Sequence, residues 1–285
     1  MLNFIVTEKN MHNITDIEIK DQIHSASEAF TRQAPVYDDY EVDNENLKRV
    51  RNEIYKHVLR FIRPTDKILE INAGTGTDAV FFAQNGYRIH ATDVAAGMVE
   101  VIKEKAKAKG LEEKLTTQQL SFTELSPAVE KPYAYCFSNI GGLNCIPDLT
   151  QFTEQLPLAL PPGGVVTIVI MPRLCPWEWL ELFRGRAKVA FRRLQKGGAV
   201  VSPKGIPYHI YYFSPSNVIK AFAPKFRLLK LQSLSLFAPP MDRKQFPKRH
   251  PQLYKFFVAL DNLFTHRFPF NRLGDFLIFS FRYEP

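Results

Sequence analysis

Short apolar runs alternate with amphipathic stretches over the first 171 residues of the chain. A short buried strand is predicted at residues 67–71, and further strands are predicted at residues 87–92, 115–120, 132–138 and 165–171. Apolar residues at helical spacing predict helices at residues 23–31, 44–62, 77–85, 98–109 and 149–160. This alternation indicates right-handed βαβ units and a doubly wound, mostly parallel α/β sheet.

The alternation ends after residue 171. Residues 180–194 carry one apolar stripe, and arginine and lysine fill the rest of the segment. Further strands are predicted at residues 208–213, 226–236 and 275–283, and further helices from residue 214 and at about 253–264. The pattern divides the chain into an N-terminal arm and lid segment (1–43), a core (44–171), an inserted basic and aromatic lid (172–214) and a C-terminal part of the sheet (215–285) with a second insertion at about 237–274.

The positive charge lies in the second part of the chain. The whole chain has 37 Lys and Arg, 29 Asp and Glu and a net charge of +8. Residues 1–170 carry 17 positive and 23 negative side chains, whereas residues 171–285 carry 20 and 6. A C-terminal part that is basic and rich in phenylalanine favours an anionic or membrane-associated partner but does not specify which.

Cysteine count and hydropathy restrict the class of protein. Cys136, Cys145 and Cys175 have no paired spacing, which argues against a disulfide framework and against a metal site. No apolar run has the length of a membrane-spanning helix, and the N-terminal residues lack a secretory signal pattern. We expect a cytoplasmic protein, with peripheral contact with a membrane surface and the oligomeric state left open.

A glycine loop follows the first predicted strand in "LEINAGTGTDA" (residues 69–79). A strand that runs through such a loop into a helix presents backbone N–H groups to a ligand. Gly74, Gly76 and Asp93 also fit a dinucleotide fingerprint. Glu70 argues against this interpretation, because a carboxylate beside the loop suits the cationic ammonium and sulfonium of S-adenosylmethionine better than a pyrophosphate. Asn72 replaces a first glycine and tolerates unusual turn dihedrals.

The chain resembles the class I S-adenosylmethionine-dependent methyltransferases over residues 66–171. The pieces that carry the resemblance are "ILEINAGTGTDA", "IHATDVAAGMV", "QLSFTELS", "CFSNIGGLN" and "LPPGGVVTIVIM". The stretch "AFTRQAPVYDDYE" (residues 29–41) is similar to the lead-in of the small-molecule members, including the quinone and menaquinone methyltransferases. The resemblance implies a seven-stranded Rossmann-like sheet with an antiparallel last strand, S-adenosylmethionine as cofactor and S-adenosylhomocysteine as product.

The resemblance also implies a set of cofactor-binding residues. Asp93 would accept hydrogen bonds from the ribose, Met98 would lie against the adenine, and Glu70 would act at the methionine end. The full set is Tyr37, Glu70, Asn72, Ala73, Gly74, Gly76, Asp93, Val94, Met98, Ser121, Phe122, Asn139 and Ile140.

The acceptor and the catalytic groups are less defined. The catalytic residues remain unknown, with His209 and Tyr37 as candidates for a general base. We expect the acceptor pocket to include Gly142, Asn144, Trp177, Trp179 and Tyr211, with Phe183 and Tyr212 from the lid. Such a pocket favours a small hydrophobic or aromatic acceptor, and O-methylation over C- or N-methylation.

Other acceptors and roles stay open. "SNIGGLN" lacks the Asn-Pro-Pro-aromatic signature of the members that modify bases and glutamine, which disfavours nucleic acid and protein amides. An RNA methyltransferase that uses its basic C-terminal part is the alternative, and a non-catalytic cofactor-binding protein is a further one. A lipid-like acceptor, with residues 184–193 resting on a membrane, is also open.

Overall fold

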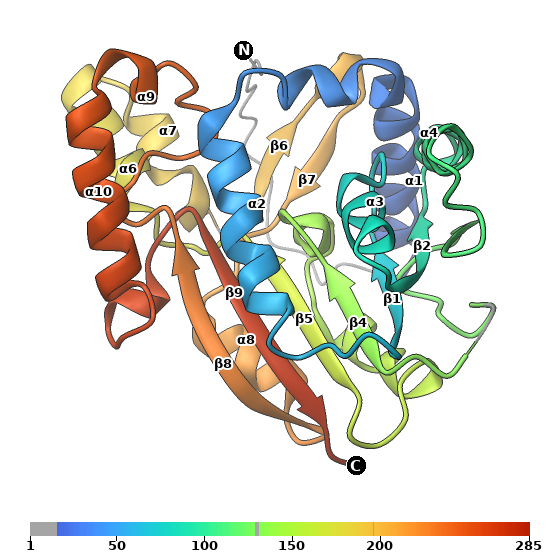
Figure 1. The fold of residues 1–285 in the computed structure, drawn as a ribbon. Coiled ribbons are helices and arrows are strands. Elements are labelled where there is room, and N and C mark those ends of the chain that lie inside the picture. Colours follow the sequence, from blue (N-terminus) through green and yellow to red (C-terminus); the bar gives the residue numbers. More distant parts are fainter. Residues whose placement is uncertain (1–15, 129–130, 196) are drawn as a thin grey trace.

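The computed structural model describes residues 16–128, 131–195 and 197–285. The strands of its main sheet are β1 (Lys67–Ile71), β2 (Arg88–Asp93), β3 (Leu115–Gln119), β4 (Tyr135–Ser138), β5 (Val165–Ile170), β8 (Phe226–Leu234) and β9 (Phe276–Tyr283). They are ordered β3-β2-β1-β4-β5-β9-β8 (Figure 1). Neighbouring strands run parallel, except that β9 is antiparallel to both β5 and β8. The predicted fold, including its antiparallel last strand, is confirmed.

Helices cover both faces of this sheet. The helices α2 (Glu45–Val58), α3 (Thr77–Gln84) and α4 (Ala96–Ala108) contribute to one buried apolar cluster, and α8 (Pro215–Phe222) contributes to another. Successive residues of β9 alternate between the two clusters: Leu277 and Phe279 belong to one, and Ile278 belongs to the other. Strands covered on both sides are apolar along their whole length, which is why the short apolar runs were readable as strands.

Some predicted elements are shorter or broken. The helix predicted at residues 149–160 is α5 (Thr150–Thr153) followed by a 3-10 turn at Leu156–Leu158. Pro157 within that turn has no N–H to donate, so a continuous helix cannot form. The strand predicted at residues 208–213 covers only β7 (Tyr208–Ile210), which pairs with β6 (Ala199–Val201) in a separate two-stranded sheet.

The N-terminal arm is helical where it is described. α1 (Asp16–Gln33) starts earlier than the helix predicted at residues 23–31, and a 3-10 helix, η1 (Ala34–Tyr40), follows it. Residues 1–15 of the predicted arm lie outside the described residues. Gln22 of α1 donates to the backbone oxygen of His209 at 2.7 Å, so this arm packs against β7, far along the sequence.

Two insertions leave the carboxyl ends of β5 and β8. The first contains α6 (Pro176–Trp179), η4 (Leu180–Arg184), α7 (Ala187–Phe191) and η5 (Arg192–Leu194); the second contains α9 (Phe246–Arg249) and α10 (Pro251–Phe264). The apolar stripe at residues 180–194 is therefore divided among short turns, with Gly185 at a φ of 71° between η4 and α7. The Trp177 ring meets the rings of Phe246 and Phe257 edge-on, and the helices α6, α7, α9 and α10 lie together beside β8 (Figure 1).

A buried ion network anchors the first insertion to the sheet. Arg193 donates to Glu178 at 2.7 Å, to the Asp275 carboxylate at 2.6 Å and to the Asp275 backbone oxygen at 2.9 Å. Arg192 donates to the same Glu178 carboxylate. Of the predicted basic stripe, Arg193 is thus buried and Arg192 is half-buried, so most of the exposed charge of this segment comes from the other residues.

Candidate active site

The glycine loop adopts a backbone that few residues tolerate. Asn72, Gly74 and Gly76 have φ values of 53°, 56° and 75°. A Cβ on Gly76 would lie 2.8 Å from Ile102 Cγ1, so α3 can begin against α4 only if this position is glycine. Asn72 adopts the left-handed conformation in place of a glycine, which asparagine does more readily than most residues. The loop therefore leaves its backbone open at the carboxyl end of β1.

Asp93 joins this loop to the end of β2. One carboxylate oxygen accepts from the Gly74 N–H at 2.8 Å, and the other accepts from the Ala95 N–H at 2.9 Å. Burial raises the pKa of Asp93 to about 6, and these backbone donors oppose the shift. Each carboxylate oxygen keeps a second lone pair, so the group can still accept hydrogen bonds from a diol.

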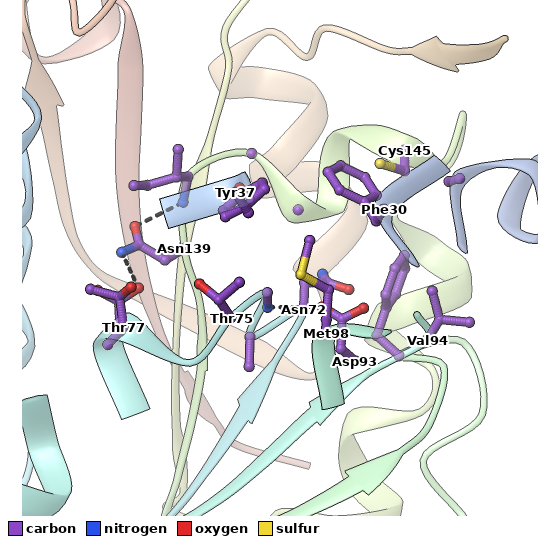
Figure 2. A pocket seen from close by; sticks show the side chains of 18 of the residues that line it. Phe30, Tyr37, Asn72, Thr75, Thr77, Asp93, Val94, Met98, Asn139 and Cys145 are labelled. Atoms are coloured by element: carbon purple, nitrogen blue, oxygen red, sulfur yellow. Dashed lines mark hydrogen bonds between the residues drawn. The ribbon is translucent and has the colours of Figure 1, made fainter. Parts of the chain in front are cut away.

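A cavity opens above the loop, where the strand order reverses between β1 and β4. This is the usual ligand position in doubly wound sheets. Including its open mouth, the hollow holds about 1030 Å³. Figure 2 shows Thr77 and Asn139 at one end, Val94 and Met98 at the other, and Tyr37 and Phe30 above them.

The end beside β2 is apolar. Val94, Met98 and Phe122 form its wall, and Ile23 and Ala26 of α1 also line the cavity. These flat and flexible apolar groups suit a planar heterocycle. Ser121, also predicted here, lies outside the lining: its hydroxyl is hydrogen-bonded to the Thr123 hydroxyl at 2.8 Å.

The opposite end is charged, and sequence reasoning missed its main residues. Asp78 accepts from Asn139 Nδ2 at 2.7 Å and from the Tyr55 hydroxyl at 2.6 Å, and it forms an ion pair with Arg51. Arg51 also pairs with Glu41 at 2.5 Å. Arg51, Asp78 and Asn139 all line the cavity, so this end offers both a cation and a carboxylate. Asp78 directly follows the glycine loop, so its position could have been predicted from the sequence. Arg51 lies on α2, and only tertiary packing brings it to the cavity.

Glu70 lies behind the loop, outside the cavity lining. Its side chain is buried on β1, and its Oε2 atom has no hydrogen-bond partner. Burial and the nearby Asp78 carboxylate raise the pKa of Glu70, and Arg51 opposes this shift. A buried carboxyl group with one unpartnered oxygen, beside the Asp78 and Asp93 carboxylates, makes this region more favourable for a cationic ligand than for a pyrophosphate. These residues therefore fit S-adenosylmethionine: Asp93 would hold the ribose, and Arg51 and Asp78 would hold the amino-acid end.

A cap closes the cavity from above. Tyr37 of η1 meets Phe30 of α1 edge-on at 6.3 Å, and its ring lies 3.8 Å from where a Cβ on Gly74 would stand. Asp38 accepts from the Thr75 hydroxyl at 2.5 Å and pairs with Lys105 of α4 at 2.6 Å, which holds η1 onto the loop. The rest of the upper wall comes from β7 and the loops after β4 and β5: Ile140, Gly141, Gly142, Cys145, Met171, Tyr208 and Ile210.

Several residues predicted for the acceptor pocket lie elsewhere. Asn144 supports the wall from behind, because its side chain donates to the Met171 oxygen at 3.1 Å and accepts from the Met171 N–H at 2.9 Å. Tyr211 stacks on His209, and neither ring lines the cavity. His209 is hydrogen-bonded to the Gly197 oxygen at 3.1 Å. Of the proposed base candidates, only Tyr37 faces the cavity.

The aromatic residues of the first insertion are also outside this wall. Trp177 packs against α9 and α10, and Arg193 lies over the Tyr212 ring at 5.3 Å. Trp179 and Phe183 are exposed. The part of residues 172–214 that reaches the cavity is the β6–β7 hairpin, which follows these aromatics in the sequence. No group of three or more potential metal ligands occurs among the described residues, and no described helix is long and apolar enough to cross a membrane.

Comparison with known proteins agrees with this geometry. Residues 68–164 match the family described as "Methyltransferase domain", a range that holds the glycine loop, Asp93 and Asn139. No curated protein sequence matches the chain.

Solved structures share the fold at low sequence identity. The DhpI–SAH complex is 16% identical with a TM-score of 0.55, covering 93% of this chain and 98% of that one. A SAM-dependent methyltransferase from Methanosarcina mazei is 14% identical, with a TM-score of 0.55 and coverage of 80% and 97%. Geranyl diphosphate C-methyltransferase from Streptomyces coelicolor is 11% identical, with a TM-score of 0.54 and coverage of 83% and 80%. These structures show the fold. The match of residues 68–164 to the methyltransferase domain family, on this fold and with this cavity, supports a class I S-adenosylmethionine-dependent methyltransferase.

Proposed function

We propose that this enzyme methylates a small, largely apolar acceptor on an oxygen that is already ionised, or ionises readily, at neutral pH. S-adenosylmethionine supplies an electrophilic methyl group when bound. The protein's part is to align the acceptor and to exclude water. The observation that carries the proposal is the chemistry of the cavity's upper wall.

The upper wall is apolar, and its ionisable groups are neutral. Phe30, Met171 and Ile210 give an apolar surface. Burial raises the pKa of Cys145 to about 12 and raises the pKa values of Tyr37 and Tyr208 above that of free tyrosine. A weakly acidic hydroxyl would need a general base to remove its proton. The described lining residues offer none beyond the carboxylates Asp78 and Asp93, which are hydrogen-bonded at the cofactor end.

An acidic acceptor such as a phenol or an enol suits this wall. Its anion would be partly neutralised as it meets the sulfonium, so a dry apolar pocket favours the transfer. Tyr37 can then donate a hydrogen bond to the acceptor oxygen as a neutral phenol, which makes it a positioning residue. α1, η1 and the β6–β7 hairpin would together close over the acceptor.

Labelled methyl transfer to a series of phenols with different acidities tests this proposal. The pH dependence of kcat/KM should follow the pKa of each phenol, because no enzyme base sets the ionisation. His209→Ala should leave these profiles unchanged, and Tyr37→Phe should raise KM more than it lowers kcat. An inflection at one fixed pH for all phenols would refute the proposal.

Cofactor binding is checked separately. S-adenosylhomocysteine should raise the melting temperature of the wild-type chain, and Asp93→Asn should abolish that shift. Trp179→Ala, outside the cavity, is the matched control and should keep it. Methyl label that enters only RNA from a cell extract would favour the nucleic-acid alternative instead.

A further inference from the structure

The two insertions, residues 172–198 and 237–274, expose many of their apolar side chains and bury several of their charged ones. They make up less than a quarter of the chain, yet they hold eleven of the sixteen large hydrophobic side chains that are exposed among the described residues. They include Trp179, Phe183, Phe191, Leu253, Phe256, Leu263 and Phe268. Phe183 alone is 89% exposed. So dense a set of exposed apolar groups marks a surface that contacts something apolar.

The same insertions bury charged groups. Glu178, Glu181 and Asp261 are buried, as is Arg193. Glu181 pairs with Arg184, Arg186 and Arg243, the last of which comes from the second insertion. The polar network inside holds the two insertions together. Trp177, Phe246 and Phe257 add an aromatic contact between them, whereas the exposed apolar side chains take no part in this contact.

α10 shows exposed apolar and buried polar side chains within one helix. Leu253, Phe256 and Leu263 are spaced by three and seven residues, so they share one helical face, and all three are 44% exposed or more. Tyr254 and Asp261 point to the buried side. A soluble surface helix normally has the reverse arrangement.

The charge of the exposed surface is strongly positive. The two insertions contain fourteen Lys and Arg against four Asp and Glu, whereas the rest of the chain contains 23 against 25. Three of the four acidic side chains are the buried Glu178, Glu181 and Asp261, so the exposed charge is almost entirely cationic. Lys188, Arg249 and Lys255 are exposed among the apolar groups.

We propose that the two insertions form a docking surface for an anionic lipid bilayer. Apolar side chains enter the boundary between headgroups and acyl chains, and lysine and arginine stay at the headgroup level. Anionic lipids add a favourable contribution from each cation. The leucines argue against RNA, because a nucleic acid offers aromatic and phosphate groups and no aliphatic environment.

The docking surface lies at the edge of the sheet that also holds the cavity. Both insertions leave carboxyl ends of strands, β5 and β8, and the glycine loop leaves the carboxyl end of β1 (Figure 1). A docked molecule therefore brings this edge to the membrane. The proposal does not depend on which acceptor the enzyme methylates.

Vesicle co-sedimentation of the full chain tests the proposal. Wild type should bind vesicles of phosphatidylcholine with about a third phosphatidylglycerol, and bind pure phosphatidylcholine much more weakly. The triple variant Leu253→Ser, Phe256→Ser, Leu263→Ser should weaken binding by about tenfold or more. The triple variant Lys188→Gln, Arg249→Gln, Lys255→Gln should lose most of the preference for anionic vesicles.

Matched controls make each outcome decisive. Val42, Leu59 and Leu158 are also exposed but lie outside the insertions, and serine at all three should leave binding unchanged. The S-adenosylhomocysteine thermal shift of every variant shows that it is folded. Equal loss with the control triple, or no binding to anionic vesicles, overturns the proposal. Binding to homopolymeric RNA that is lost in the leucine and phenylalanine variant, or a dimer that dissociates in it, would assign the surface to those partners and also overturn it.

Discussion

α2 and α10 each span fourteen residues, but they stand in opposite relations to solvent. α2 buries Leu47, Val50, Ile54 and Val58 against the sheet and exposes Glu45, Lys48 and Lys56. α10 buries Tyr254 and Asp261 and exposes leucine and phenylalanine. Apolar spacing therefore indicates that a helix forms without saying which of its faces the protein covers.

The buried polar groups of the two helices also differ in use. Arg51 of α2 reaches the cavity, and His57 bonds to Gln232 and Ser280 in the sheet. Asp261 of α10 accepts from the Phe237 N–H at 2.8 Å and pairs with Arg49 at 3.4 Å. α2 thus connects the core to the site, whereas α10 is held by this polar contact and by the rings of Phe257 and Phe264, and it leaves Leu253, Phe256 and Leu263 free for another surface.

The largest expected effect, on the free energy of unfolding, comes from a substitution in the buried apolar face of α2. Ile54→Ala should lower the free energy of unfolding by about 3 kcal/mol, because it leaves a cavity in a fully buried position. Urea denaturation measures this. Leu59→Ala, at the exposed end of the same helix, is the control and should cost less than about 1 kcal/mol. Equal costs would mean that α2 is not packed as described.

Acid should destabilise the protein through His57. The neutral ring can donate from Nδ1 to Gln232 Oε1 at 3.0 Å and accept from the Ser280 hydroxyl at 2.9 Å. Burial lowers the pKa of His57 to about 4, from an ordinary value of 6.5. The unfolded chain then binds the proton first, so stability is lost as pH falls from about 6.5 to about 4, by about 3 kcal/mol in all.

Urea denaturation across this pH range checks the assignment. His57→Gln should be less stable than wild type at pH 7, and its stability should fall less steeply between pH 6.5 and pH 4. A variant that keeps the full wild-type slope would show that other groups cause the acid sensitivity.

A smaller effect, on S-adenosylhomocysteine affinity, is expected when a cation is removed from α2 but not when one is removed from α10. Arg51→Met should weaken S-adenosylhomocysteine binding by about 10- to 100-fold, because a charge-assisted hydrogen bond contributes about 1.5–3 kcal/mol. Lys255→Met removes the same charge from α10 and should leave the affinity unchanged. Isothermal titration calorimetry measures both. An unchanged affinity in Arg51→Met would remove Arg51 from the cofactor site.

The smallest effect is expected from the exposed face of α10. Leu253→Ser with Phe256→Ser should change the free energy of unfolding by less than about 1 kcal/mol in water, since neither side chain supports the interior. Denaturation without lipid tests this, and S-adenosylhomocysteine affinity should also be unchanged. A clearly larger loss of stability would show that α10 needs this face for packing, and the contrast with α2 would disappear.

Much of the cavity lining at the carboxyl ends of β1 and β2 could be predicted from the sequence, because the signals there are local. Gly74 and Gly76 lie in the loop after β1, Asp93 is the last residue of β2, and parallel strands bring their carboxyl ends to one edge. The acceptor end was not readable in this way. Its wall joins α1 to β7, and one contact between them, from Gln22 to His209, spans 187 residues.

The sequence by itself determined the strands of the main sheet, the glycine loop and the excess of cations in the second part of the chain. These depend on neighbours within a few residues, through side-chain periodicity and turn dihedrals. Only the tertiary structure decided that Arg51 lines the cavity, that Trp177 lies outside it and that α10 has leucines on its exposed face. Which face of an element is covered depends on contacts between distant segments, and local periodicity is the same whether the apolar face meets the core or another surface.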